Sequence, residues 1–233
     1  MFKGIFVHIP KVAGTSIAKA FEPFQEEVVI TESTNFFKHT KARLDLTPLF
    51  NFDISSTMLT KHLVGDYIWN NTFKFAFVRN PWDRYVSNWK WLTRKEKLYP
   101  TKGWKARGWR GEDGTITFED FVNQVEKIYL WRPMGYQHDK WHLGNQVEHL
   151  KGEAPLDFIG KYENLKEDFK HVCDKLETSV ELPYLNHVGF YEDEPQTTQP
   201  HYSTYYTDET AEIVRQRCLP DIMTFNYEFE WRK

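Results

Sequence analysis

The chain has 233 residues, of which 40% are hydrophobic and 27% are charged. Its 30 basic and 33 acidic residues give a formal net charge of −3, which excludes a bulk positive field that would draw the protein onto nucleic acid or a membrane surface. We therefore expect neither as a partner. Length and apolar content suit one domain over residues 1–233 with a sizeable core.

Apolar runs and cysteines give weaker expectations about location and redox state. No run approaches the about 20 residues that span a bilayer, and the run at residues 4–9 is too short for a signal peptide. We therefore expect a cytoplasmic protein. Two cysteines, Cys173 and Cys218, make no disulfide framework, and we expect buried free thiols.

The first motif lies at residues 10–16, directly after the apolar run 4–9 and before a short helical pattern. A strand, a tight loop with one lysine and a hydroxyl-rich helix start favour a bound anion, because free N–H groups and the helix dipole lie there. The residues that we expect to bind a phosphate are Lys11, Val12, Ala13, Gly14, Thr15 and Ser16. The alternative is an ordinary strand-to-helix turn in which Thr15 or Ser16 is the N-cap.

The order of residues in this loop differs from a Walker A loop. That loop carries its lysine after the last glycine, whereas Lys11 precedes Gly14 by three residues. The order does not fit a P-loop kinase or ATPase.

The second motif, R-N-P-W-D-R-Y-V-S at residues 79–87, follows an expected strand at 73–78. Pro81 suits the first turn of a helix, which we expect to end near Leu98. Arg79 at the strand exit and Ser87 two turns into the helix can bind one phosphate together. The alternative is a buried Arg–Asp pair beside a helix that only packs. The expected buried face carries Trp82, Tyr85, Val86, Trp89 and Leu92, with Arg84, Ser87, Asn88 and Lys90 off its centre.

Further expected strands at residues 27–30 and 157–162 alternate with helical or irregular segments. Such spacing predicts an α/β fold with a parallel sheet. Ligands of open parallel sheets bind beyond the carboxyl ends of the strands, where both motifs begin.

Together the two motifs resemble the 5′-phosphosulfate loop and the 3′-phosphate motif, R-[ND]-P-x-x-R-x-x-S, of sulfotransferases that use 3′-phosphoadenosine 5′-phosphosulfate (PAPS). Residues 157–169 and the closing helix in 205–227, with Thr207 as its N-cap, are similar to Golgi-type carbohydrate sulfotransferases. The resemblance implies a P-loop-like three-layer domain, PAPS as donor, adenosine 3′,5′-bisphosphate (PAP) as product, and no required metal.

The resemblance also implies catalytic roles. Lys11 would stabilise charge on the leaving phosphate, and His62 would be the base, as a histidine at a similar place is in uronyl 2-O-sulfotransferases. Other branches use a glutamate, so Glu32 and Asp66 are weaker substitutes. A histidine that caps a strand or loop is the alternative for His62.

The acceptor side is expected in the middle of the chain. Residues 94–117 are basic, contain tryptophans and predict a long loop, in which Trp104 and Trp109 could stack on sugar rings; a solvated insertion is the alternative. Arg132 and His138 would lie on the same side in the family. His138 and His142 stand four residues apart, but the pattern lacks the glutamate of H-E-x-x-H, and we expect no metal site.

We therefore expect a sulfotransferase that acts on a glycan or a hydroxylated small molecule. Two alternatives remain: a small-molecule kinase with an atypical P-loop, which would need magnesium, and a non-catalytic glycan-binding module.

Overall fold

The structure is a computed structural model that describes residues 3–24, 28–32, 43–45, 55–98, 116–130, 143–183 and 200–232. The chain forms two compact units. One, here the sheet unit, comprises Met1–Arg79 and Gln146–Thr198; the other, here the helical unit, comprises Asn80–Asn145 and Gln199–Lys233. Since two compact units can belong to one domain, the single domain stays a prediction.

The sheet unit contains five parallel strands in the order β3-β2-β1-β4-β5. The strands are β1 (Gly4–Val7), β2 (Val28–Glu32), β3 (Arg43–Asp45), β4 (Phe73–Val78) and β5 (Phe158–Lys161). The predicted α/β fold with a parallel sheet is confirmed, and four strands coincide with the predicted runs to within two residues at each end. The edge strand β3 was not predicted, because three residues are too few to show a pattern.

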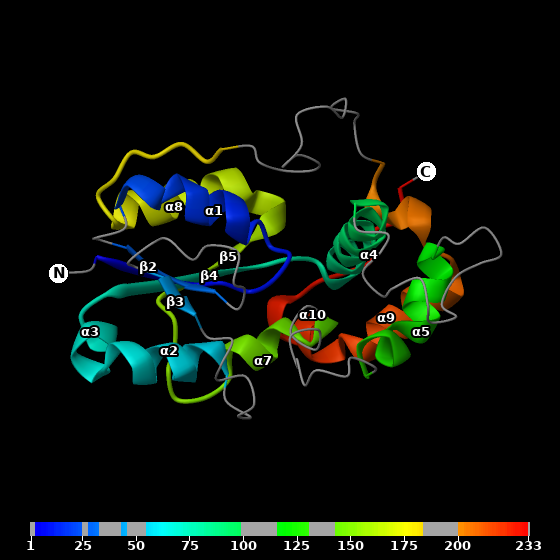
Figure 1. Ribbon diagram of the computed structural model, residues 1–233, viewed down its shortest axis with the longest axis horizontal. Helices are drawn as coiled ribbons and strands as arrows, with labels where there is room; N and C mark the ends of the chain where they lie inside the picture. The colour runs from blue at the N-terminus through cyan, green and yellow to red at the C-terminus, as the bar shows by residue number, and fades with distance from the viewer. Residues whose placement is uncertain are drawn as a thin grey trace. The chain divides into compact units, whose positions relative to one another are not determined.

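Helices cover both faces of this sheet (Figure 1). On one face lie α1 (Gly14–Ala20) and α8 (Leu165–Lys175), and on the other lie α2 (Ser56–Val64) and α3 (Asp66–Asn70). Shorter elements are η1 (Glu22–Phe24), α7 (Gln146–Leu150) and η4 (Tyr162–Asn164). Phe21 joins the layers, because its ring lies 6.0 Å from that of Phe75 in β4 and 5.4 Å from that of Phe169 in α8.

The order in which successive strands are added across the sheet reverses between β1 and β4, although the strands themselves are parallel. From β1 the chain proceeds outward to β2 and β3, whereas β4 lies on the opposite side of β1 and pairs with it through Gly4↔Phe73 and Phe6↔Phe75. In open α/β sheets the ligand crevice forms at such a reversal, beyond the carboxyl ends of the strands. Both predicted phosphate motifs start at this point of the sheet.

The helical unit contains α4 (Pro81–Leu98), α5 (Phe118–Leu130), η5 (Tyr202–Tyr205), α9 (Asp208–Arg217) and α10 (Leu219–Phe225). Helix α4 ends where predicted, and Thr207 caps α9 in a capping box with Thr210 as expected for an N-cap. The closing helix is divided, because Cys218 ends α9 and Pro220 lies in the first turn of α10. Among the helices that the structure describes, none is long and apolar enough to cross a bilayer.

The buried face of α4 is wider than predicted. Trp82, Tyr85 and Val86 are buried as expected, whereas Trp89 is half-buried. Arg84 and Asn88 are also buried, and the Arg84 guanidinium donates from Nη1 to the Gly144 carbonyl at 2.8 Å. Helix α4 is thus packed on more than its apolar stripe, and a buried arginine is tolerated because a carbonyl accepts from it.

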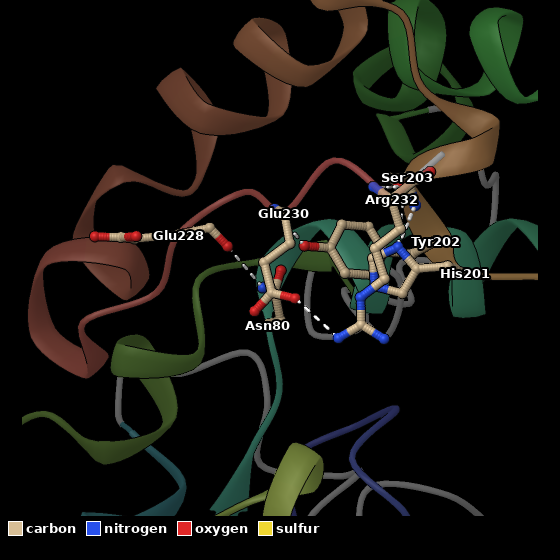
Figure 2. A network of polar contacts seen from close by, with 7 residues as sticks. All are labelled: Asn80, His201, Tyr202, Ser203, Glu228, Glu230 and Arg232. Carbon is tan, nitrogen blue, oxygen red and sulfur yellow. Dashed lines mark hydrogen bonds and ion pairs between the residues drawn. The ribbon is translucent and has the colours of Figure 1, made fainter.

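Asn80 connects the start of α4 to the C-terminal segment (Figure 2). Its Oδ1 accepts from the Trp82 amide at 3.1 Å, and its Nδ2 donates to the Glu228 carbonyl at 3.0 Å. Further along, the Glu230 amide donates to the Tyr202 hydroxyl at 2.9 Å and the Arg232 amide to the Ser203 hydroxyl at 3.1 Å. The last described residues therefore belong to the packed helical unit.

Both cysteines are buried and unbridged, which confirms the prediction of free thiols. Burial raises the pKa of the Cys173 thiol, and it raises the pKa of Cys218 to about 12.

We expect neither thiol to react with a thiol-specific chromogenic reagent at about pH 8 in the native protein, because the reactive thiolate is depleted below a raised pKa and access is blocked. Two thiols should react once denaturant unfolds the chain. Rapid labelling of the native protein would contradict the buried placement.

Candidate functional site

The loop between β1 and α1 has an unusual backbone. Lys11 and Ala13 are left-handed, with φ of 71° and 68°, although neither is glycine, and Val12 between them is not. Such residues cost about 1–3 kcal/mol each and collect at ligand-binding loops. Alternation of left- and right-handed residues turns successive N–H groups toward one side, which makes a concavity for an anion.

Helix α1 begins without a side-chain cap. Its N-cap is Ala13, whose side chain has no acceptor, so the alternative in which Thr15 or Ser16 is the N-cap is wrong. Both hydroxyls lie instead in the first turn, Thr15 half-buried and Ser16 buried. Because α1 has only seven residues, the loop amides and the charge of Lys11, more than the helix dipole, would attract an anion.

Gly14 allows the His8 ring to lie against the loop. A Cβ atom at Gly14 would stand 1.8 Å from Nε2 of His8. The His8 ring also stacks on Phe6 with centroids 5.7 Å apart, which fixes it over the end of β1. His8 is therefore a packing residue of the loop.

Arg79 joins the ends of three strands. It is the first residue after β4, and its Nη1 donates to the Lys11 carbonyl at 3.1 Å. Its guanidinium lies 3.9 Å from the ring centroid of Tyr162, the first residue after β5. The guanidinium is thus oriented by a carbonyl and an aromatic face, and cation–π contacts of this kind strengthen where water is excluded. The structure brings together Lys11 and Arg79, one from each predicted phosphate motif.

Ser87, the other member of the second motif, is half-buried on α4 in the helical unit. Its part in phosphate binding beside Arg79 stays a prediction.

The structure does not bring His62 to the loop. His62 is exposed in the last turn of α2, and α2 runs toward α3, which leads into the amino end of β4 (Figure 1). Asp66, the first residue of α3, lies at the same end. Lys11 follows the carboxyl end of β1, so the two regions lie at opposite edges of the sheet.

Glu32 lies at the same edge of the sheet as the loop that contains Lys11. It is the last residue of β2, and the pairing Val7↔Thr31 places it directly beyond the end of β1.

The predicted acceptor residues lie outside the described residues. These are Trp104, Trp109, Arg132 and His138, and His142 lies outside as well. Of the loop expected at 94–117, residues 94–98 belong to α4 and residues 99–115 are not described. Within the described ranges, no three His, Cys, Asp or Glu side chains are grouped as metal ligands.

Comparison with known proteins identifies the family. The sequence profile of the group described as "Sulfotransferase family" matches residues 3–228. The chain belongs to the sulfotransferase family. Membership implies PAPS-dependent transfer of a sulfuryl group, so this sulfotransferase is an enzyme with PAPS as donor. An uncharacterized protein of Archaeoglobus fulgidus is 25% identical over 125 residues, which cover 53% of this chain and 83% of that protein.

Two residues of the candidate site had no role in the sequence prediction. Tyr162 could have been found, because it ends the strand predicted at 157–162, at the same edge of the sheet as Lys11 and Arg79. Gln146, which contacts the Arg79 backbone, gave no signal, because its partner lies 67 residues away in sequence.

We expect Gly14→Ala to lower the affinity for PAP about tenfold or more, because the new methyl group must displace His8 or the loop. Isothermal titration calorimetry measures the change. Gly4→Ala is the matched control, since Gly4 starts β1 away from the loop and a Cβ there meets only the flexible end of the Leu176 side chain. The double variant His8→Ala/Gly14→Ala should bind PAP more tightly than Gly14→Ala alone. Wild-type affinity in Gly14→Ala would contradict the role of this contact.

Proposed function

We propose that this sulfotransferase moves the sulfuryl group of PAPS to a hydroxyl of a carbohydrate or a similar polar acceptor and releases PAP. The observation that carries the proposal is the contact between Arg79 and the Lys11 carbonyl, which joins the two phosphate motifs at the β1–β4 reversal.

The donor would bind through both of its ends. Amides of Val12, Ala13 and Gly14, with the hydroxyls of Thr15 and Ser16, would hold the 5′-phosphosulfate. Arg79 and Ser87 would hold the 3′-phosphate. Remote contacts of this kind aim the sulfur at the acceptor without taking part in the reaction. The left-handed Lys11 and Ala13 support this assignment, because non-glycine residues in this conformation collect at ligand-binding loops.

The reaction is an in-line displacement at sulfur. The acceptor oxygen forms a bond to sulfur while the bond from sulfur to the bridging oxygen of the 5′-phosphate breaks, and the electron pair leaves with PAP. Negative charge therefore grows on the leaving phosphate. Lys11 would stabilise this charge, and one such group is typically worth about 10²- to 10³-fold in rate. No step requires a metal ion.

The proton of the acceptor hydroxyl needs a base. We assign this role to Glu32 rather than His62, because Glu32 ends β2 beside β1, whereas His62 is exposed toward the other edge of the sheet. In this proposal the carboxylate would take the proton as the oxygen–sulfur bond forms.

The carbohydrate acceptor rests on sequence. Residues 157–169 resemble the carbohydrate sulfotransferases, and the segment after α4 combines tryptophans with basic residues, a composition suited to sugar rings and acidic groups.

A screen with ³⁵S-labelled PAPS tests the function, with oligosaccharides, phenols and amines as acceptors. We expect label in oligosaccharides, unchanged by a metal chelator, and a loss of about 10²- to 10³-fold in Lys11→Ala. Lys170→Ala, an exposed lysine of α8 paired with Asp174, is the control for loss of charge. Label only in phenols or amines would exclude the carbohydrate acceptor. Loss of transfer with chelator would contradict metal-free chemistry. Absence of ³⁵S transfer to every acceptor, together with magnesium-dependent phosphoryl transfer from a nucleoside triphosphate, would favour the kinase alternative.

The base assignment predicts opposite results for two variants. Glu32→Gln should lower kcat by about 10²- to 10⁴-fold with little change in the affinity for PAP, because only proton transfer is lost. His62→Ala should keep most of the activity. The reverse pattern, with activity lost only in His62→Ala, would return the role to the histidine.

A further inference from the structure

The side-chain amide of Gln146 forms hydrogen bonds with both the N–H and the carbonyl group of the Arg79 backbone. Its Oε1 accepts from the Arg79 amide at 2.8 Å, and its Nε2 donates to the Arg79 carbonyl at 2.8 Å. Gln146 is the first residue of α7 and has no exposed surface. One buried amide thus binds both backbone polar groups of the residue that leads out of β4.

These two bonds continue the sheet where its ladder ends. Strand β4 pairs with β5 as far as Val78↔Lys161, one residue before Arg79. A residue of an antiparallel strand would exchange the same two hydrogen bonds with Arg79. The Gln146 amide takes that place, and it fixes the direction in which the Arg79 side chain leaves the strand.

The far end of the same side chain is held separately. The guanidinium donates to the Lys11 carbonyl and lies over Tyr162. A long, flexible side chain keeps one orientation only if both its backbone and its terminal group are held in place. Gln146 holds the backbone of Arg79.

We infer that Gln146 is a positioning residue for recognition of the donor's 3′-phosphate and that it acts through Arg79. This inference rests on the proposed function, in which Arg79 binds that phosphate.

A purely structural role would be to attach α7 to the rest of the sheet unit. Helix α7 has a second buried polar attachment of this kind, the 3.0 Å hydrogen bond between His149 Nδ1 and Ser56 Oγ of α2. Ser56→Ala is therefore a matched control, because it weakens the packing of α7 and leaves the Arg79 backbone bonds in place.

The first experiment measures the affinities of the full chain for PAP and for adenosine 5′-monophosphate, which lacks the 3′-phosphate. Gln146→Met removes the two hydrogen bonds to the Arg79 amide and carbonyl, and we expect affinity for PAP to fall about tenfold. Affinity for adenosine 5′-monophosphate should not change. Arg79→Ala should remove the preference for PAP, and adding Gln146→Met to it should have no further effect, since the two act as one unit. Ser56→Ala should keep the preference.

A second variant separates positioning from folding. In Gln146→Glu a protonated carboxyl group offers one acceptor and one donor in the places of the amide, whereas the carboxylate offers acceptors only. Burial favours the protonated form. The preference of Gln146→Glu for PAP, relative to wild type at the same pH, should therefore recover as the pH falls from about 8 to about 6. Wild type measured at each pH corrects for titration of the phosphate.

The outcomes distinguish the two hypotheses. If wild type binds PAP no more tightly than adenosine 5′-monophosphate, the proposed function loses its 3′-phosphate site. If wild type prefers PAP and Gln146→Met keeps that preference, the inference about Gln146 is overturned. If Gln146→Met does not fold, the pH series decides: recovery at low pH supports positioning, and a preference equal to wild type at every pH overturns it.

Discussion

The parallel pairing of β1 with β4 is the constraint on which the site depends. Parallel strands end at the same edge of a sheet, so the segments that leave these two strands start side by side. Residues 68 positions apart in sequence, Lys11 and Arg79, come into contact for this reason. The helices on both faces keep the central strands buried and leave their carboxyl ends as the place where polar groups collect.

Around that edge the site is organised by Arg79 more than by any helix end. Its backbone is bound by Gln146, and its guanidinium contacts a loop carbonyl and an aromatic ring. Groups that are already oriented need little rearrangement when a charged ligand arrives, which lowers the free-energy cost of binding and strengthens catalytic charge stabilisation. The left-handed loop and the ordered arginine are two halves of the same arrangement, since the carbonyl that Arg79 contacts belongs to the left-handed Lys11.

Much of the fold was predictable because its central strands are continuous apolar runs, as in 73–78, and because Pro81 and Thr207 mark helix starts. Local chemistry also located Lys11 and Arg79. What failed is non-local: β3 is too short to show a pattern, and Gln146 meets Arg79 only through tertiary packing. The left-handed backbone conformation of Ala13 could not be predicted from the sequence either, because alanine ordinarily favours the right-handed helix. The catalytic base stays a prediction: His62 was proposed from the family resemblance, and it lies in the last turn of α2.

The left-handed residues of the loop lower the stability of the folded chain at positions where binding of the donor requires them. Lys11 and Ala13 adopt a conformation that glycine or asparagine would adopt at lower energy, so substitutions there can make the folded chain more stable. The same substitutions would remove the lysine or loosen the arrangement of N–H groups that an anion needs. Selection for heat resistance alone would therefore enrich, at these two positions, proteins that fold better and hold the donor less well.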